Sequence, residues 1–329
     1  MNSIWYGNNL LRYLLLPLSV IFWLVSGFRR LLFVLRLRKI HRFPVPVIVV
    51  GNITVGGTGK TPLVVWLSKH LQSLGYRPGI VARGYGGKAS HWPQQVRADS
   101  DPVMVGDEAV LLARLSGCPV CVAPKRADAV QELLKYTQCN IVLSDDGLQH
   151  YAMGRDMEIV VIDGQRGLGN GYLLPAGPLR ELPGRLRRAD LLISNGPWQE
   201  DVPVMNIEEP QLLPLLDLST QPHPLSQAAD ETVHAVAGTG NPQRFFAMLE
   251  RHGLKVIPHA FPDHHGYSRG ELQFDDDLPV LMTEKDAVKY ARFAGNKHWL
   301  VRIGVVPDDK FVTKLDELLQ GLKHGQEVT

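Results

Sequence analysis

A glycine-rich turn followed by lysine and threonine is the segment of this sequence best suited to bind phosphate. An apolar, β-branched run over residues 45–50 precedes the turn, and a helical pattern from Leu63 follows it. Backbone N–H groups in such a turn, and the dipole of the following helix, point toward an anion. We expect Lys60 to reach the outer phosphates of a nucleotide and the Thr61 hydroxyl to bind Mg²⁺. The complete set of expected phosphate-binding residues in the turn is Thr54, Val55, Gly56, Gly57, Thr58, Gly59, Lys60 and Thr61.

The turn departs from the usual phosphate-loop pattern G-x-x-x-x-G-K-[ST] at its first position, where Thr54 stands in place of glycine. Gly56, Gly57 and Gly59 still allow the backbone to curl around an anion. Because the lysine lies between a strand and a helix, we interpret the segment as a nucleotide phosphate site. The alternative is a glycine-rich turn that a lysine follows by chance.

Two adjacent carboxylates occur where a metal-binding acid is expected. Residues 141–144 form an apolar run typical of a buried strand, and the run ends at Asp145 and Asp146. Ligands of parallel α/β sheets bind outside the carboxyl ends of the strands, and phosphate-loop enzymes hold Mg²⁺ with an acid placed there. A strand that ends in Asp-Asp-Gly is also a common turn. Beside a phosphate loop, we expect the pair to bind metal or take part in catalysis.

Further polar side chains occur at predicted loops and helix ends. Asp107 and Glu108 open a predicted helix, where acids commonly act as ordinary capping residues. Arg180 lies in a proline-rich loop, residues 175–181. His264 and His265 share a later loop, and either could bind a metal, although no partner residues occur at a supporting spacing.

Apolar runs alternate with helical segments through much of the chain. Expected strands cover residues 79–82, 119–123, 141–144, 158–162 and 191–194, and expected helices cover residues 109–115 and 127–136. This alternation predicts an α/β fold with a doubly wound, mostly parallel sheet, as in P-loop NTPases. A second set, with strands at 233–236, 278–282 and 299–303 and a helix at 243–252, predicts a second, smaller α/β domain.

We therefore expect four parts along the chain. They are an N-terminal membrane-associated helix in residues 1–42, a phosphate-loop core in 43–200, a linker in 201–230 and the smaller domain in 231–329. The linker is predicted from five prolines, at 203, 210, 214, 222 and 224. A chain of 329 residues with 45% hydrophobic and 21% charged residues can form two domains and is not disordered.

Charge is divided unequally along the chain. Residues 1–98 contain 13 Lys and Arg and no Asp or Glu, so this end should face an anionic partner. Residues 13–28 are uncharged and mostly apolar, with Arg29 and Arg30 directly after them. We therefore expect an anionic membrane surface as the partner, and no nucleic acid, with the rest of the chain kept cytoplasmic by the basic flank. These 16 residues are few for a span, which needs about 20, so a spanning helix and an interfacial helix both remain open.

Seven segments, in order along the chain, together resemble one family. They are G-N-I-T-V-G-G-T-G-K-T-P from Gly51, A-R-G-Y-G from Ala82, G-D-E from Gly106, D-D-G-L-Q-H from Asp145, L-P-A-G-P-L-R-E from Leu174, F-P-D-H-H from Phe261 and T-E-K-D from Thr283. Each motif is weak alone, but their order and spacing resemble the tetraacyldisaccharide 4′-kinases of lipid A synthesis. The Thr54 departure is shared with this family's loop, and the basic, apolar N-terminus also fits.

The resemblance implies transfer of the γ-phosphate of ATP to the 4′-hydroxyl of a tetraacylated glucosamine disaccharide 1-phosphate, a membrane-embedded glycolipid. The reaction would take place at the cytoplasmic face of the inner membrane of a Gram-negative bacterium. By the same resemblance, Asp107 accepts the hydroxyl proton and His264 orients it from the other domain, which implies domain closure. The remaining implied roles are phosphate binding by Lys60 and Thr61, Mg²⁺ binding by Thr61, Glu108 and Asp146, catalysis close by at Asp145, and charge neutralisation by Arg126 and Arg180.

Two other classes of protein are compatible with parts of the sequence. A regulatory P-loop GTPase or ATPase, such as a switch or metal-delivery protein at the membrane, would share the phosphate loop. GTPases read guanine with N/T-K-x-D, whereas Lys285 in T-E-K-D stands one place later, which argues against guanine. A membrane scaffold or part of a transporter would need more than one hydrophobic segment, and the sequence has one.

Overall fold

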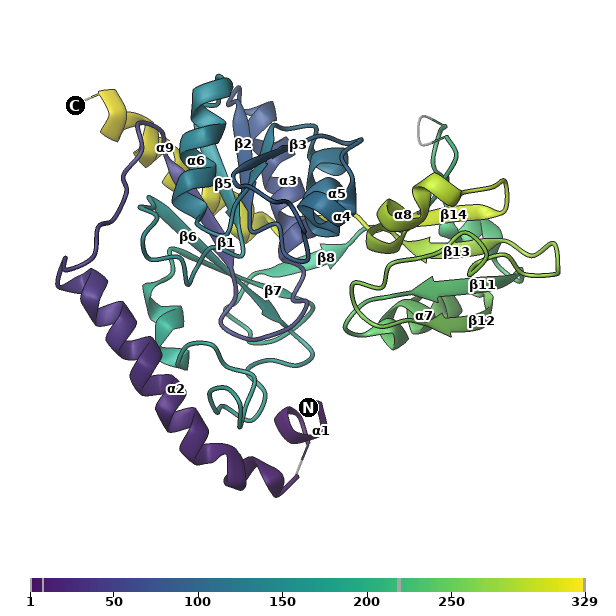
Figure 1. The fold of residues 1–329 in the computed structure, drawn as a ribbon, viewed down its shortest axis with the longest axis horizontal. Helices are drawn as coiled ribbons and strands as arrows, with labels where there is room; N and C mark the ends of the chain where they lie inside the picture. The colour runs from purple at the N-terminus through teal and green to yellow at the C-terminus, as the bar shows by residue number, and fades with distance from the viewer. Residues whose placement is uncertain (1, 8, 218–219, 328–329) are drawn as a thin grey trace.

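The chain folds around two separate sheets, as the computed structural model in Figure 1 shows for residues 2–7, 9–217 and 220–327. The larger sheet carries the phosphate-loop segment. The smaller sheet lies to one side of it and is formed by later residues (Figure 1). The expected fold class, a mostly parallel doubly wound sheet with a second, smaller α/β unit, is confirmed.

The larger sheet has nine strands in the order β15-β8-β7-β6-β1-β5-β2-β4-β3. The strands from β8 to β4 are parallel, and the edge strands β15 and β3 are antiparallel to their neighbours. All residues of the central strand β1 are buried, as expected for a parallel strand covered on both faces. The bounds are β1 Val47–Gly51, β2 Pro78–Ala82, β3 Gln94–Val96, β4 Val120–Val122, β5 Ile141–Asp145, β6 Met157–Asp163, β7 Leu191–Asn195, β8 Val204–Ile207 and β15 Val305–Pro307.

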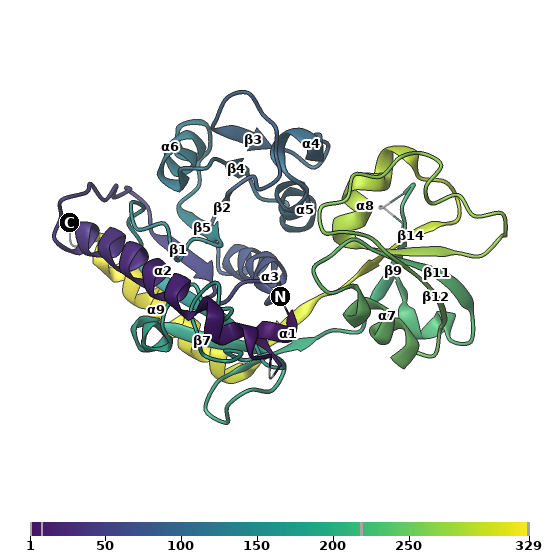
Figure 2. The same ribbon diagram turned by 60° about the horizontal axis from the view of Figure 1, so that its bottom comes forward.

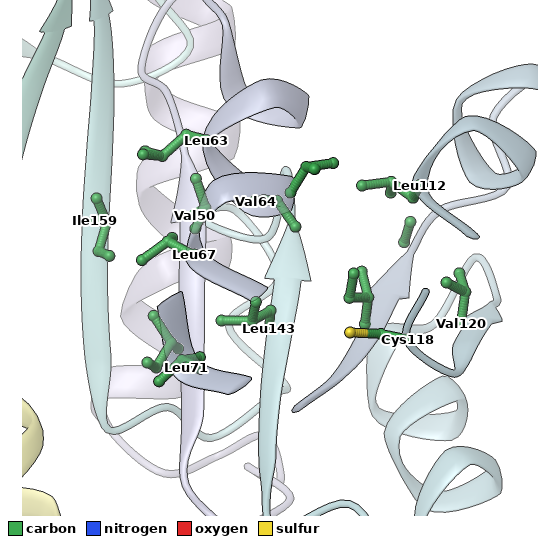
Figure 3. Packing of buried hydrophobic residues seen from close by; sticks show 14 of the residues in the cluster. Val50, Leu63, Val64, Leu67, Leu71, Leu112, Cys118, Val120, Leu143 and Ile159 are labelled. Carbon is green, nitrogen blue, oxygen red and sulfur yellow. The ribbon is translucent and has the colours of Figure 1, made fainter. Parts of the chain in front are cut away.

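Helices cover both faces of this sheet. Alternate strand residues point to opposite faces, so Val50, Leu143 and Ile159 face α3, where Leu63 and Leu67 pack against them (Figure 3). The opposite face packs on α6 and on part of α2. The helix bounds are α1 Asn2–Trp5, α2 Leu11–Val34, α3 Lys60–Ser73, α4 Pro102–Val105, α5 Asp107–Ser116, α6 Arg126–Tyr136 and α9 Asp309–Glu327, with 3-10 turns at Pro183–Arg188, Leu225–Ala228 and Ala291–Phe293.

The smaller sheet has the order β10-β9-β14-β13-β11-β12. Strands β14, β13, β11 and β12 are parallel, and β9 and β10 add antiparallel pairs at one edge. One face packs on α7 through Phe245 and Leu249, and the other packs on α8 through Ala287 and Tyr290. The bounds are β9 Gln211–Pro214, β10 His223–Pro224, β11 Thr232–Ala237, α7 Pro242–Arg251, β12 Lys255–Ala260, β13 Val280–Thr283, α8 Glu284–Tyr290 and β14 His298–Arg302.

The sheets divide the chain differently from the expected boundaries. The segment 201–230, expected as a linker, contains β8, β9 and β10, of which β8 belongs to the larger sheet and the other two to the smaller one. After β14 the chain returns to the larger sheet, where β15 pairs with β8 and Phe311 and Leu315 of α9 join the core. The smaller sheet is therefore an insertion in the larger unit, because both of its ends connect to the larger sheet.

Helix α2 lies along the outside of the larger sheet unit (Figures 1 and 2). Within the described residues it is a candidate membrane span, with 24 residues, mean hydropathy 1.7 and only 6% of its most apolar stretch buried. Ser19 attaches the helix to the loop before β7 by donating to the Leu173 carbonyl at 2.9 Å and accepting from the Ala176 amide at 3.0 Å. Phe33 is buried beside the Tyr151 ring. The helix thus has a narrow side attached to the protein and a wide apolar side facing outward.

Candidate active site

The phosphate-loop segment connects β1 to the first turn of α3, which begins at Lys60. Gly59 precedes the helix with a φ of 91°, and Gly56 has a φ of 111°. A side chain at Gly59 would approach the Asn195 amide nitrogen to 2.7 Å, so the position requires glycine for both reasons. The Val55 amide donates to the Pro178 carbonyl at 2.8 Å, and Thr54 pairs with Leu179. The loop that carries Arg180 is thereby held against the phosphate loop.

The two acids at the end of β5 have different partners. Asp145 is buried and accepts a hydrogen bond from the Thr61 hydroxyl at 3.3 Å. Burial raises the pKa of Asp145 to about 7, although the Lys60 ammonium acts in the opposite direction. Its Oδ1 atom and the hydroxyl of Thr58 are buried without a hydrogen-bond partner among the described residues. Both residues border the phosphate-loop segment, since Thr58 belongs to it and Asp145 accepts from Thr61.

Asp146 lies in the left-handed backbone region, with a φ of 50°, which is uncommon outside glycine. Its carboxylate accepts from Arg180 Nη1 at 2.9 and 3.0 Å, and its Oδ1 lies 3.6 Å from Lys60 Nζ. Burial opposes ionisation of Asp146, but Lys60 and Arg180 together hold its pKa below the usual value. The structure therefore brings Lys60, Asp146 and Arg180 together as one ionic group.

Arg126, at the start of α6, is buried beneath this group. Its guanidinium donates to the Ala123 carbonyl at 3.0 Å and to the Asp145 carbonyl at 3.4 Å. Burial lowers the pKa of Arg126 to about 10, while the neighbouring carboxylates of Asp145 and Asp146 oppose this shift. Burial and the charges of Arg126, Arg83 and Arg29 also lower the pKa of His150 to about 3, so His150 is neutral there. Positive potential therefore extends from the β5 end toward α2.

Asp107 and His264 are in contact although they come from different sheet units. Asp107 is buried at the start of α5, and its two carboxylate oxygens lie 3.2 and 3.1 Å from His264 Nδ1. The residue before Asp107 must be glycine, because Gly106 has a φ of 95° and a Cβ atom there would lie 2.6 Å from the Tyr85 carbonyl oxygen. The Tyr85 ring lies 5.0 Å from the His264 ring. His264 itself has a φ of 61°, a strained position of the kind that clusters at functional sites.

Glu108, the neighbour of Asp107, is bound by a residue to which the sequence patterns gave no role. Lys285 Nζ lies 3.2 Å from Glu108 Oε1 and 4.0 Å from Asp107 Oδ2. In the sequence, Lys285 stood out only as part of the T-E-K-D segment. That segment was one of the seven family motifs and a poor match to the guanine motif of GTPases. Glu108 also lies near enough to Asp145 to contribute to raising the pKa of that acid. The Asp107 group and the phosphate-loop group are therefore parts of one site.

His265 has a different partner from His264: its Nε2 atom is paired with Glu271 Oε1 at 2.7 Å. Among the residues that the structure describes, no group of three or more His, Cys, Asp or Glu side chains is placed to hold a metal ion by itself. Any metal at this site would therefore need ligands from hydroxyl groups or from a bound phosphate as well.

Two cavities open next to these groups. A cavity of 720 Å³ connects Asp146, Arg126 and Arg180 with Phe22, Val25 and Arg29 of α2. A second cavity of 440 Å³ borders Asp107 and His264. The larger cavity joins the ionic groups of the site to the exposed apolar helix, so a ligand with a polar head and apolar chains could contact both.

Comparison with known proteins gives consistent matches over nearly the whole chain. The sequence model of the family described as tetraacyldisaccharide-1-P 4′-kinase matches residues 11–320. A tetraacyldisaccharide 4′-kinase of Nitrosococcus oceani is 50% identical over 316 residues, covering 96% of this chain and 93% of the relative. One of Alkalilimnicola ehrlichii is 53% identical over 289 residues, covering 85% and 84%. The crystal structure of LpxK from Aquifex aeolicus in complex with ATP matches with a TM-score of 0.80 and 29% identity, over 95% of this chain and 99% of that one.

Proposed function

This chain belongs to the tetraacyldisaccharide-1-P 4′-kinase family, and from that membership and its site we infer how it carries out the reaction. It is a kinase that transfers the γ-phosphate of ATP to the 4′-hydroxyl of a tetraacyldisaccharide 1-phosphate in lipid A biosynthesis. The regulatory GTPase or ATPase considered from the sequence is not favoured by these comparisons. The observation that carries the residue assignment is the contact between Asp107 and His264, close to the phosphate loop.

We propose that the phosphate loop, residues 54–61, holds the ATP phosphates. Lys60 would place its ammonium on the outer phosphates, where it would exchange its contact with Asp146 for phosphate oxygens. Arg126 and Arg180, already directed at the end of β5, would neutralise charge on the transferring phosphoryl group or on the phosphate of the lipid. Asp145 would hold the Thr61 hydroxyl in place.

We propose Thr61, Glu108 and Asp146 as the residues that would hold Mg²⁺. The residues fit this ion, because Mg²⁺ prefers oxygen ligands and the site offers a hydroxyl, several carboxylates and the unpartnered Asp145 Oδ1. When bound, Mg²⁺ would neutralise the charge of the phosphates during transfer. The requirement for ligands beyond the protein carboxylates agrees with a metal that binds together with the nucleotide.

We propose that Asp107 accepts the proton of the 4′-hydroxyl. A sugar hydroxyl is a poor nucleophile at neutral pH, so a carboxylate must take its proton as the new bond forms. His264 would orient the carboxylate by donating from Nδ1. Because the two residues come from different sheet units, the active arrangement would form when the smaller unit, acting as a separate domain, closes on the phosphate-loop domain.

We propose that α2 attaches the kinase to the cytoplasmic face of the inner membrane, at an anionic surface. Its exposed apolar residues, together with Arg29 and Arg30 in its C-terminal part, suit an acyl-chain region and its phosphate headgroups. The 720 Å³ cavity would then receive the headgroup of the glycolipid while its acyl chains remain with the membrane. We propose no nucleic acid partner.

Purified protein, γ-labelled ATP and tetraacyldisaccharide 1-phosphate in detergent micelles test this function. Label should appear in a lipid product with a second phosphate at the 4′ position and should depend on the lipid. Labelled inorganic phosphate released without lipid, and with GTP as well as ATP, would instead indicate a regulatory nucleotidase. Omitting Mg²⁺ should stop the transfer.

A further inference from the structure

A cavity of 340 Å³ opens at the C-terminal end of α2. Its walls come from the last turns of α2, from the chain directly after that helix, from the segment 151–158 and from the 3-10 turn Pro183–Arg188. It shares only Tyr151 and Met153 with the 720 Å³ cavity, and its described lining contains no residue proposed for catalysis or for binding ATP or Mg²⁺. The cavity is therefore separate from the proposed substrate site.

The lining of this cavity is strongly basic. The described residues that line it include five arginines and one acid, which are Arg30, Arg42, Arg155, Arg185, Arg188 and Glu158. The acid is already paired twice, because Glu158 Oε1 lies 3.0 Å from Arg155 Nη1 and Oε2 lies 2.6 Å from Arg185 Nη2. Within the part of the chain that the structure describes, no carboxylate pairs with Arg30, Arg42 or Arg188. These three like charges repel one another, so an anion that enters the cavity is attracted by all of them.

The fold holds much of this cavity in place. Two of the guanidinium groups contact the Tyr151 ring, with Arg30 Cζ 6.0 Å and Arg155 Cζ 5.9 Å from its centre. The chain after α2 is also fixed, because the His41 amide and carbonyl each form a 2.8 Å hydrogen bond with the backbone of residues 152–154. The walls that carry the arginines are therefore positioned by the protein itself.

Apolar side chains line the same cavity. Phe33, Val34 and Ile40 belong to its wall, and Val34 and Ile40 are 65% and 42% exposed. They continue the wide apolar side of α2, which we propose to lie in the acyl-chain region. A ligand that fits both parts of the wall has a phosphate head, which guanidinium groups bind with paired hydrogen bonds, and apolar chains directly beside it. Basic pockets next to membrane helices on the cytoplasmic side bind phospholipid headgroups in this way.

We propose that this cavity binds the headgroup of one anionic phospholipid of the surrounding membrane. The phosphodiester group would accept hydrogen bonds from Arg30, Arg42 and Arg188, and the acyl chains would lie against Val34 and Ile40. A zwitterionic phospholipid fits less well, since its headgroup cation would meet the same arginines. This inference rests on the proposed attachment of α2 to the membrane and adds one specific lipid at a defined place.

Binding of a soluble short-chain lipid to the full-length protein tests this proposal. Dihexanoyl phosphatidylglycerol, kept below the concentration at which it forms micelles, is titrated calorimetrically into the protein in a non-ionic detergent. One molecule should bind per chain. Dihexanoyl phosphatidylcholine and inorganic phosphate should each bind much more weakly, because the first carries a cation and the second lacks apolar chains.

A double variant, Arg42→Gln with Arg188→Gln, removes two of the unpaired arginines from the cavity. It should weaken binding of the anionic lipid by about 10–100-fold, because each hydrogen bond to a charged group contributes roughly tenfold or more in affinity. The matched control is Arg38→Gln with Arg187→Gln, which removes two exposed arginines from the same two segments but outside the cavity lining. The control changes the net charge equally and should bind the lipid as the wild type does.

Equal weakening in the cavity variant and in its control would indicate a diffuse basic surface and would overturn the proposal. Equal affinity for inorganic phosphate or for phosphatidylcholine would also overturn it. Displacement of the bound lipid by tetraacyldisaccharide 1-phosphate would assign the cavity to the substrate instead.

Label transfer from γ-labelled ATP, measured in the same detergent without anionic lipid, separates this proposal from the proposed function. Both double variants should transfer label at the wild-type rate, which also shows that they fold. Loss of transfer in the cavity variant alone would assign its arginines to the substrate and overturn the proposal. A wild type that binds the anionic lipid but transfers no label would support the lipid site and contradict the proposed function. A wild type that transfers label but does not bind the anionic lipid would overturn the lipid site alone.

Discussion

Lys60 is the residue on which the proposed nucleotide site depends most directly. Its ammonium lies 3.6 Å from Asp146 Oδ1 at the start of α3, where the amides of the proposed phosphate loop would surround a phosphate. Lys60→Ala should abolish detectable phosphoryl transfer, because it removes the positive charge on the outer phosphates. The assay is label transfer from γ-labelled ATP to the lipid. Lys69→Ala, which removes an exposed lysine from the same helix, should remain active. Full activity of Lys60→Ala would remove the basis of the phosphate-loop assignment.

Asp107 and His264 should behave as one unit. Asp107→Ala should lower kcat by about 10²–10⁴-fold, the usual range for loss of a general base, with a much smaller change in the KM for ATP. His264→Ala should also slow turnover, and the double variant should be little slower than the worse single variant. Asp309→Ala is a suitable control, because it also removes an acid from the first turn of a helix. Losses that multiply in the double variant would show that the two residues act independently.

At the level of single residues, sequence patterns identified the polar side chains that end a strand or open a helix next to the phosphate loop. The structure places Lys60, Asp146 and Arg180 in one ionic group and pairs Asp107 with His264. Composition and spacing alone gave Asp107 and His264 little weight, and the family resemblance paired them. Lys285 received no role, because its partner Glu108 lies 177 positions away in the chain and no local pattern can show such a contact.

Helix α8 offers a pH-dependent prediction through its first residue. Glu284 is partly buried, with its side chain 14% exposed and Oε1 3.8 Å from Arg302 Nε, and loss of solvation raises its pKa to about 7 despite the opposing charge of Arg302. In the unfolded chain the pKa of Glu284 should be about 4.3. Between about pH 4.3 and 7 the folded protein therefore binds more protons at this residue than the unfolded chain does. The contribution of Glu284 to the free energy of unfolding is therefore fully present below about pH 4. It falls by roughly 2–4 kcal/mol as the pH rises toward 7.

Glu284→Gln should make this decline smaller by the part that residue 284 contributes, because glutamine does not titrate, while Asp145, whose pKa is also raised to about 7, titrates in both proteins. Urea unfolding of both proteins at pH 5 and pH 8 measures the effect as the change in the free energy of unfolding. Glu250→Gln, an exposed position on α7, should leave the decline unchanged. An equal decline in wild type and Glu284→Gln would show that another group is responsible.

At the level of elements, the long buried strands and the helices at 109–115, 127–136 and 243–252 were predicted, whereas α8, α9 and the short edge strands were not. The expected strands at 141–144 and 158–162 correspond to β5 and β6 within one residue at either end. The segment 201–230 was predicted as a linker because its prolines mark breaks, yet proline is tolerated in an edge strand such as β10, and Pro214 stands at the end of β9. Strand β15 has three residues, too few for any alternation to be recognised, so the return of the chain to the larger sheet could not be foreseen.

Attachment of the whole molecule to the membrane should depend on α2. Deleting residues 1–40 should release the protein from membranes and retain ATP binding, because β1 begins at Val47 and α2 has only two buried residues, Ser19 and Phe33. Transfer to the lipid should fall strongly, since the deletion removes one wall of the 720 Å³ cavity. Membrane sedimentation in high salt and nucleotide binding measure the two effects. If the truncated protein still pellets with membranes in high salt, another surface carries the attachment.

Because the smaller unit is an insertion, two chain connections rather than one limit how far His264 can move from Asp107. Two short connections join the units, residues 208–210 and 303–304, and the Glu208 amide donates to the Gly304 carbonyl at 3.0 Å across them. A unit held by a single flexible linker samples a large volume, and the effective concentration of one site at the other falls as the linker lengthens. Two paired connections restrict the smaller unit to a narrow range of orientations. If the units open and close as proposed, His264 would therefore stay at a high effective concentration near Asp107 in the open state as well.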